Sequence, residues 1–278
     1  AAQVNRVVRL VIDADTNRVT QCRMTGGQRG AFLDTGADLN TISLSTMTSN
    51  VVNFSGLYLF QGSSNTVVDS YIQGSTAALV TGSTGTMIGG SVLIATNTAG
   101  AALALTGGNV NLRLSSSVLT AFMGTAGAKP LYLDKYNKGW LVFSTNTLSG
   151  GQYGAYVSSQ VAGAQVWFTS NTILVSTSAV NATYGLYVNG LLGGATIQNN
   201  GIYYRRAGAV SLSALPGWER EAHAAALQAY AAGCRPAADP LCEAARTMAA
   251  RAPSPALAKA WFEANFAAVE ARTPDGAP

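Results

Sequence analysis

A short apolar segment recurs through the first 212 residues, and this repeat constrains the fold more than any other feature. Each copy has three residues, such as Ala-Phe-Leu at 31–33, Leu-Tyr-Leu at 57–59 and Leu-Tyr-Val at 186–188. The spacing between copies varies from about 20 to about 31 residues, and the other copies begin at Ala77, Ala101, Leu131 and Ala155. A repeat of this length with variable insertions is typical of a solenoid, in which each coil contacts only its neighbours.

Two further patterns indicate what each coil contains. Apolar residues alternate over short stretches, which is the period of a β-strand. Asparagines recur at matching positions, at Asn40 and Asn65 and again at Asn146, Asn171 and Asn200. Identical polar side chains at one coil position can stack about 4.8 Å apart and hydrogen-bond along the stack. We therefore predict an all-β fold, a right-handed parallel β-helix (solenoid) over residues 1–212.

This repeat resembles the parallel β-helix superfamily of adhesins, phage tail-spikes and polysaccharide lyases. The resemblance covers residues 1–212 and implies a protein directed at cell-wall or surface polysaccharide. We predict no cofactor and no metal site.

The composition changes abruptly near Leu212, which predicts a domain boundary there. All glutamates, seven of the eight prolines and the single histidine, His223, follow that residue. Residues 213–278 are rich in alanine and are predicted to form a small α-helical segment. The first residues of the chain already resemble the middle of a coil, so we expect the sequence to be a piece of a longer protein.

The distribution of charge argues against nucleic acid as a partner. Residues 1–210 contain eleven basic residues and six aspartates, and the basic residues are concentrated at the start of the chain. A nucleic-acid surface would need a sustained basic face with aromatic residues beside it. No apolar stretch of about 18 residues is present, so we predict no transmembrane segment.

Three aspartates near the start are the candidate catalytic residues of the solenoid. Aligning Asn17 with Asn40 puts Asp15 directly beneath Asp38 on the neighbouring coil, with Asp34 close by. Paired carboxylates can share a proton or bind a cation, and β-helix lyases and glycosidases use several acidic residues in one groove. The alternative explanation is that nearby Arg18 and Arg23 neutralise Asp15 and Asp38. The solenoid also contains no glutamate or histidine, which argues against an enzymatic groove.

The stretch Asp-Thr-Gly-Ala-Asp at 34–38 also resembles the catalytic loop of retroviral-type aspartic proteases. That family places two such loops together in a symmetric dimer. Here the stretch falls where the repeat needs a turn, and turns favour Asp and Gly. We therefore interpret it as a turn.

Aromatic residues gather in the last coils and provide a candidate glycan-binding face. Tyr132, Tyr156 and Tyr187 share one repeat position, so we expect them to stack and to contribute to the core. Tyr136, Trp140 and Trp167 are the candidate glycan-binding residues, because aromatic rings can stack on sugar rings.

Residues after Leu215 follow a helical period. We predict three helices, over 218–232, from Asp239-Pro240 to Arg251, and from Ser254-Pro255 to Thr273-Pro274. A disulfide between Cys234 and Cys242 would indicate an oxidising compartment, the alternative being two unpaired thiols. Cys22 is far from the other two cysteines in the sequence and is predicted to be a buried thiol.

The tail resembles the start of the membrane-bound lytic transglycosylase A family, through Leu-Pro-Gly-Trp at 215–218 and Ala-Trp-Phe-Glu-Ala-Asn-Phe at 260–266. The resemblance covers about residues 213–275 and implies a periplasmic or extracellular protein acting on peptidoglycan. The family's catalytic aspartate belongs to a domain that would follow Pro278, so no catalytic residue is carried over.

Together these observations predict an exported β-helix that binds polysaccharide or peptidoglycan and is joined to the N-terminal piece of a lytic transglycosylase. On this interpretation the chain as given is not itself an enzyme. The alternative is a β-helix polysaccharide lyase or glycoside hydrolase that uses the region of Asp15, Asp34 and Asp38.

Overall fold

The computed structural model describes residues 6–122, 127–158, 160, 163–176, 184–189, 194–205, 210–215, 217–234 and 241–268. The chain divides into two compact units, with the boundary between Tyr204 and Arg205. Composition alone puts the change near Leu212. The difference arises because β25 (Val210–Ser211) pairs antiparallel with β26 (Ala267–Ala268) and so belongs to the C-terminal unit.

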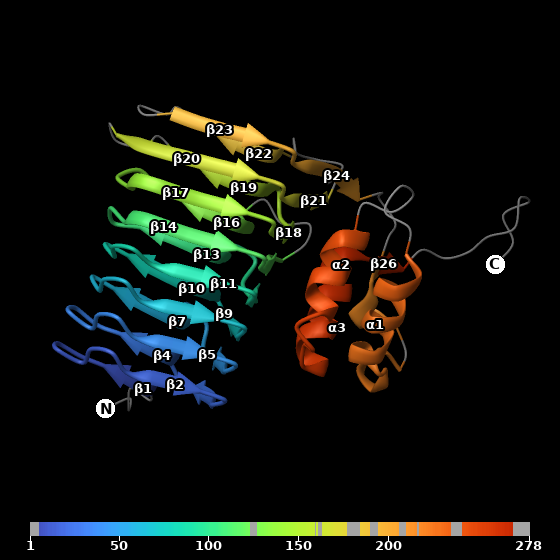
Figure 1. Ribbon diagram of the computed structural model, residues 1–278, viewed down its shortest axis with the longest axis horizontal. Coiled ribbons are helices and arrows are strands. Elements are labelled where there is room, and N and C mark those ends of the chain that lie inside the picture. The colour runs from blue at the N-terminus through green and yellow to red at the C-terminus, as the bar shows by residue number, and fades with distance from the viewer. Residues whose placement is uncertain are drawn as a thin grey trace, which may run out of the picture. The chain divides into compact units, whose positions relative to one another are not determined.

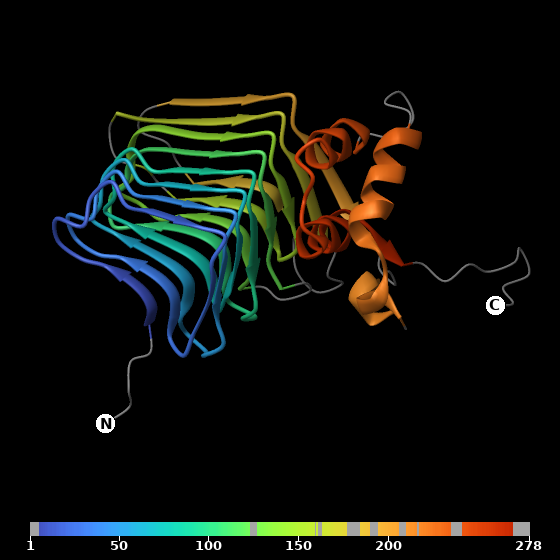
Figure 2. The same cartoon turned by 60° about the horizontal axis from the view of Figure 1, so that its bottom comes forward.

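Three parallel sheets of eight strands each make up the N-terminal unit (Figure 1). Consecutive strands of the chain go to sheets A, B and C in turn, so each coil gives one strand to each sheet, and the coils stack in register (Figure 2). This arrangement is a parallel β-solenoid, which confirms the predicted all-β solenoid class.

The strand bounds are as follows. Sheet A contains β1 (Arg6–Leu10), β4 (Arg29–Leu33), β7 (Ser55–Phe60), β10 (Thr76–Thr81), β13 (Ala101–Thr106), β16 (Lys129–Leu133), β19 (Tyr153–Val157) and β22 (Tyr184–Val188). Sheet B contains β2 (Arg18–Thr20), β5 (Thr41–Ser43), β8 (Thr66–Val68), β11 (Met87–Gly89), β14 (Val110–Ser115), β17 (Lys138–Ser144), β20 (Ala164–Thr169) and β23 (Gly194–Gln198). Sheet C contains β3 (Arg23–Gly26), β6 (Thr46–Ser49), β9 (Tyr71–Gly74), β12 (Val92–Ala95), β15 (Val118–Thr120), β18 (Thr147–Ser149), β21 (Thr172–Ser176) and β24 (Gly201–Arg205).

The core is a set of inward columns that run along the stack. In sheet A one column joins Leu57, Ala78, Leu103 and Leu131, all fully buried. Because side chains alternate across a strand, the residue after each of these points outward. The core therefore requires only one or two apolar residues per strand, which leaves the outer face free to vary.

The predicted starting residue of the repeat is wrong in two coils. Leu57 pairs with Ala78 and then with Leu103, so the repeats that the sequence places at Ala77 and Ala101 begin one and two residues later in the structure. Ala77 instead follows Gly56 in the register, at the tight corner where sheet C meets sheet A. A Cβ atom at Gly56 would overlap the Gln73 carbonyl of β9, so this corner accepts only very small residues. Alanine fits both the corner and the core column, so a run of alanines does not show which residue begins the repeat.

A ladder of serine and asparagine side chains runs along the corner between sheets B and C. In each coil the side chain accepts a hydrogen bond from the backbone N–H of the equivalent residue one coil before, through Ser45, Ser70, Ser91, Ser117, Asn146, Asn171 and Asn200. The residue preceding each member has a positive φ, between 49° at Asp69 and 57° at Gly90. This turn leaves one N–H per coil without a strand partner, and the ladder satisfies it.

The predicted asparagine ladder at the corner between sheets A and B is also confirmed. Asn17 N–H donates to Asn40 Oδ1 at 2.9 Å, and Asn40 N–H donates to Asn65 Oδ1 at 2.9 Å. The ladder resumes with Asn109 and Asn137 further along the stack. The asparagine excess of the sequence thus supports the turns and needs no catalytic explanation.

The described part of the C-terminal unit contains the α-helices α1 (His223–Gly233), α2 (Cys242–Ala249) and α3 (Pro255–Asn265). The prediction that the first helix begins at Trp218 is wrong, because Gly217 adopts a φ of 85° and residues Trp218–Arg220 form a separate 3-10 turn. Ser254 caps α3 by accepting from Leu257 N–H at 3.2 Å. The prediction that the third helix continues to Thr273-Pro274 is wrong, because α3 ends at Asn265 and Ala267–Ala268 form β26. The predicted start of the second helix at Asp239-Pro240 lies outside the described residues. Among the described residues, no helix has the length and apolar character needed to cross a membrane.

Cys234 and Cys242 form a disulfide that joins the end of α1 to the start of α2. Reducing it is expected to lower the free energy of unfolding of the C-terminal unit by about 2–3 kcal/mol, because the open chain regains loop entropy. The helical circular dichroism signal reports this unit during denaturation. Replacing Cys22 with serine is the control and is expected to leave the transition unchanged. Equal midpoints with and without reductant would contradict the expectation.

Candidate functional site

Tyrosines cover the outer face of sheet A in its last coils. Tyr132, Tyr156 and Tyr187 occupy one register position of β16, β19 and β22, with ring centroids 5.8 and 5.0 Å apart. Tyr153 and Tyr184 form a second row at the start of β19 and β22, with parallel rings 5.5 Å apart. The predicted stacking is confirmed, but the prediction that these residues contribute to the core is wrong, since their rings are half-buried and outward.

The two tyrosine rows cover most of their own ring faces. Tyr153 packs edge-on against Tyr156, and Tyr184 packs edge-on against Tyr187. Burial raises the pKa of the Tyr153 phenol, with the neighbouring phenols adding to the effect. The Tyr153 phenol therefore keeps its proton at neutral pH and can donate a hydrogen bond. This surface offers ring edges and hydroxyl groups rather than open ring faces.

Lys129 lies at the base of the tyrosine rows. Its Nζ is 5.5–5.7 Å from the ring centroids of Tyr132, Tyr153 and Tyr156 and donates to the Gly127 carbonyl at 2.9 Å. Burial lowers the pKa of this ammonium group. The rings hold the cation by cation–π attraction, so the lysine organises the tyrosines.

Two tryptophans project from sheet B in the same coils. Trp140 and Trp167 meet edge to face with centroids 5.3 Å apart, and they are 53% and 36% exposed. The register shifts in this part of the β14–β17 pair, and Trp140 N–H donates to Asn111 Oδ1 instead of to a strand carbonyl. The register between β17 and β20 is regular, and it pairs Trp140 with Gln165, so Trp140 lies diagonally beside Trp167. The pair leaves indole surface open to solvent.

We use the name aromatic surface for two groups of residues in the last coils: Tyr132, Tyr153, Tyr156, Tyr184 and Tyr187 on the outer face of sheet A, and Trp140 and Trp167 on the outer face of sheet B. Of the predicted binding residues, the structure brings Trp140 and Trp167 together. Tyr136 stands on the turn between β16 and β17, 49% exposed and with a φ of 92°, where Lys135 Nζ lies 4.9 Å from its ring centroid. Tyr153 and Tyr184 were missed, because their repeat position holds other residue types in the earlier coils.

A smaller aromatic cluster lies on sheet A near the other end of the stack. Phe32 and Tyr58 stack with centroids 5.1 Å apart, and the Arg29 guanidinium lies 4.7 Å from the Tyr58 centroid. The same register position then holds Leu79 and Ala104. These small residues separate the cluster from the aromatic surface.

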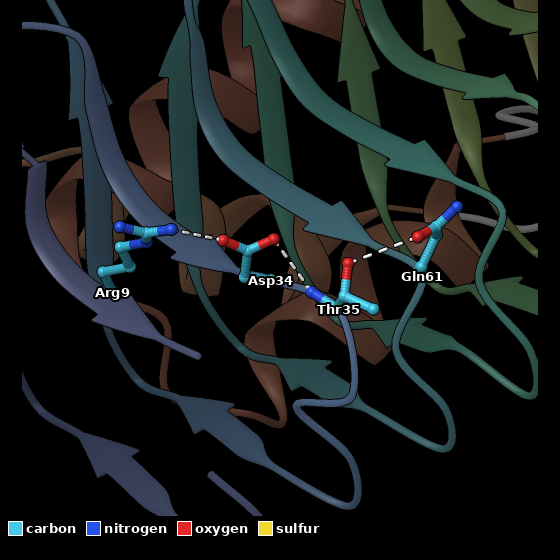
Figure 3. A network of polar contacts seen from close by, with 4 residues as sticks. All are labelled: Arg9, Asp34, Thr35 and Gln61. Carbon is cyan, nitrogen blue, oxygen red and sulfur yellow. Dashed lines mark hydrogen bonds and ion pairs between the residues drawn. The ribbon is translucent and has the colours of Figure 1, made fainter. Parts of the chain in front are cut away.

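The candidate catalytic carboxylate of Asp34 is engaged in an ion pair. Its Oδ2 accepts from Arg9 Nη2 at 2.6 Å, and its Oδ1 accepts from Thr35 N–H at 2.9 Å (Figure 3). Thr35 in turn donates to Gln61 Oε1 on the next coil. Arg9 thus neutralises Asp34. These contacts fix the turn that the Asp-Thr-Gly stretch occupies, as expected for a turn.

Asp15 and Asp38 lie one coil apart, and each accepts a backbone hydrogen bond from the next coil. Asp38 N–H donates to Asp15 Oδ1 at 2.8 Å, and Ser63 N–H donates to Asp38 Oδ1 at 2.6 Å. Within the described part of the chain, no three His, Cys, Asp or Glu side chains gather closely enough to hold a metal ion. The geometry supports a structural role for both aspartates.

Replacing Asp38 with alanine is expected to lower the free energy of unfolding by about 1–2 kcal/mol, because Ser63 N–H loses its acceptor. Asp38→Asn retains an oxygen at the same position and is expected to be close to wild type. Chemical denaturation of both variants tests this difference. If the asparagine variant were as unstable as the alanine variant, the negative charge itself would be required.

Cys22 is exposed, so the prediction of a buried thiol is wrong. It occupies the first position of the ladder between sheets B and C, and its thiol donates to the Thr20 carbonyl. The corner turns this side chain away from the core.

No protein-family model matches the chain, and no curated protein matches it. Seven chains of solved structures match it. The catalytic domain of Agl-KA is 10% identical with a TM-score of 0.37, over 69% of this chain and 42% of that one. The gp54 tailspike of Acinetobacter baumannii phage AP22, solved with capsular saccharide, is 9% identical with a TM-score of 0.34, over 72% and 41%. The Streptococcus pneumoniae surface protein and adhesin PfbA is 10% identical with a TM-score of 0.31, over 72% and 67%.

The chain spans about two fifths of the length of the first two of these proteins. At such TM-scores the fold assignment rests on the strand pairing of this chain and not on the likeness. We therefore classify the chain by its fold alone, as a parallel β-solenoid.

Proposed function

We propose that the solenoid is a polysaccharide-binding module and that the aromatic surface is where the glycan lies. The observation that carries this proposal is the exposed pair of Trp140 and Trp167 in the same coils as the tyrosine rows. Exposed aromatic surface of this kind usually marks an interaction site. An indole face packs against the C–H groups of a sugar ring, and phenol hydroxyls hydrogen-bond to its hydroxyl groups.

Binding fits the described geometry better than bond cleavage. A glycosidase needs two carboxyl groups flanking the glycosidic bond, one of them free to donate a proton. Asp15, Asp34 and Asp38 each accept a hydrogen bond from the backbone, and Asp34 also pairs with Arg9. We therefore place the lyase or hydrolase alternative second.

The proposal includes an exported location, periplasmic or extracellular, and a right-handed winding of the coils. The disulfide between Cys234 and Cys242 supports export, because such bonds persist in oxidising compartments. The prevalence of right-handed crossovers between parallel strands supports the winding.

The test is retention of the full chain on a panel of immobilised bacterial capsular and cell-wall polysaccharides. At least one polysaccharide is expected to retain the protein without releasing new sugar ends. Retention by none would contradict the proposal. Release of sugar that stops in Asp15→Asn or Asp38→Asn would favour the enzymatic alternative.

We further propose that residues 213–275 direct the protein to peptidoglycan, on the strength of the resemblance to lytic transglycosylases. The residues that carry it contact one another, since Trp218 Nε1 donates to Glu263 Oε1 at 2.8 Å and the Trp218 ring packs edge-on against Phe262. Lys259 adds ion pairs to Glu263 and Glu219. The shared residues thus form one folded unit. Co-sedimentation of the full chain with purified sacculi is expected, and its absence would contradict this second proposal.

A further inference from the structure

A cleft of about 480 Å³ opens at the corner between sheets C and A, in the earlier coils of the solenoid. It owes its shape to unequal connections in three successive coils. Residues 50–54 link β6 to β7 and residues 96–100 link β12 to β13, whereas Ser75 alone links β9 to β10. The two longer loops therefore form walls on either side, and the short connection forms the floor. Its volume is within the range of small-molecule sites.

Backbone hydrogen bonds hold both walls in place. Phe54 N–H donates to the Val51 carbonyl at 3.3 Å, and Gly100 N–H donates to the Asn97 carbonyl at 3.0 Å. Asn97 Oδ1 also accepts from Ala99 N–H at 2.9 Å. A Cβ atom at Gly100 would overlap the Ser75 carbonyl, so the second wall lies directly against the floor. The fold itself maintains the cleft, because hydrogen bonds within each wall fix its conformation and the second wall packs against the floor.

The lining of the cleft is polar but carries no charge. Its residues are three amides, four hydroxyl residues and two valines. On the floor, Gln73 Oε1 accepts from the Tyr71 hydroxyl at 2.7 Å, which leaves the Gln73 amino group as a donor toward a ligand. Val51 and Val52 are 42% and 69% exposed on one wall. A ligand with many hydroxyl groups and one apolar face matches this combination.

We propose that this cleft binds a short uncharged saccharide, at a site separate from the aromatic surface. The amides and hydroxyl groups hydrogen-bond to the sugar hydroxyls, and the valines contact the C–H face of the ring. An anionic sugar finds no opposite charge in the lining and loses its hydration without compensation. The choice of a saccharide rests on the proposed function, whereas the site itself rests on the shape and lining of the cleft.

The test is saturation-transfer NMR on the full chain with cellobiose, maltose and diacetylchitobiose, and with glucuronic acid as the anionic comparison. At least one neutral disaccharide is expected to receive saturation, and glucuronic acid is not. Thr96→Trp fills the cleft and is expected to reduce the signal at least about tenfold. Gln73→Ala is expected to weaken binding about fivefold, the effect of one hydrogen bond. Gln198→Ala, on exposed β23, is the matched control and is expected to bind as wild type does.

Absence of saturation of every neutral disaccharide, or an unchanged signal in folded Thr96→Trp, would overturn the proposal. If Thr96→Trp does not fold, Val52→Trp replaces it at an exposed position of the opposite wall. A disaccharide signal that disappears with Trp140→Ala but persists with Thr96→Trp would assign binding to the aromatic surface instead. A cleft signal without polysaccharide retention would contradict the proposed function and leave this site standing.

Discussion

Asn146→Ala is expected to lower the free energy of unfolding of the solenoid by about 3–5 kcal/mol, because three buried hydrogen bonds depend on this side chain. Its Oδ1 accepts from Ser117 N–H at 2.9 Å, and its Nδ2 donates to the Leu114 carbonyl at 3.1 Å and to Asn171 Oδ1 at 3.0 Å. Asn146 is 1% exposed, so water does not replace the lost partners. An N–H and a carbonyl would be left buried and unpaired.

Asn146→Ser is the matched control for this substitution. Serine occupies the same ladder position at Ser117, Ser91 and Ser70, where its hydroxyl accepts the N–H from the previous coil at 3.1–3.2 Å and donates to the carbonyl two residues before it. The serine variant is therefore expected to recover at least half of the lost stability. Chemical denaturation followed by tryptophan fluorescence measures both variants. Equal losses for serine and alanine would mean that packing, and not the hydrogen-bond ladder, determines the stability of this corner.

Replacing both Trp140 and Trp167 with alanine is expected to weaken polysaccharide binding about 10- to 100-fold, which corresponds to about 1.4–2.8 kcal/mol. Aromatic anchors at the centre of an interface commonly have effects of this size. Both side chains project from sheet B away from the core, so the double variant is expected to fold and to melt as wild type does. The affinity is measured with the polysaccharide that retains the wild-type protein most strongly.

Tyr203→Ala is the control for the tryptophan variant. Tyr203 is a comparably exposed aromatic residue, but it lies on β24 of sheet C, outside the aromatic surface. Its removal is expected to change the affinity less than twofold. If the control and the tryptophan variant weakened binding equally, the polysaccharide would bind exposed aromatic residues in general and not this site.

The solenoid could be predicted from the sequence because its ladders use identical residues. The Asn146, Asn171 and Asn200 repeat identifies a corner that every coil forms in the same way. The sequence does not reveal the same corner in earlier coils, since Ser45 and Ser70 accept the equivalent hydrogen bond with a shorter side chain. Alanine is equally acceptable at the tight corner and in the core, so no local pattern shows whether the repeat begins at Ala77 or at Ala78.

The candidate site was predictable only in part. Trp140 and Trp167 differ in their distance from the strand start, and they meet because they lie two residues apart in the regular register of β17 and β20. A diagonal contact of this kind leaves no periodic trace in a sequence. The sequence also does not reveal the role of Asp15 and Asp38, because the same turn position suits a catalytic carboxylate and a carboxylate that accepts a backbone hydrogen bond.

The most direct test of the polysaccharide-binding surface is the response of the four tryptophan indole N–H signals in an NMR titration with the retained polysaccharide. Two indoles belong to the aromatic surface, and the other two, Trp218 and Trp261, lie in the C-terminal unit. Trp→Phe variants assign each signal. The Trp140 and Trp167 signals are expected to shift while those of Trp218 and Trp261 stay in place. Binding that leaves the Trp140 and Trp167 signals unmoved would contradict the proposed surface.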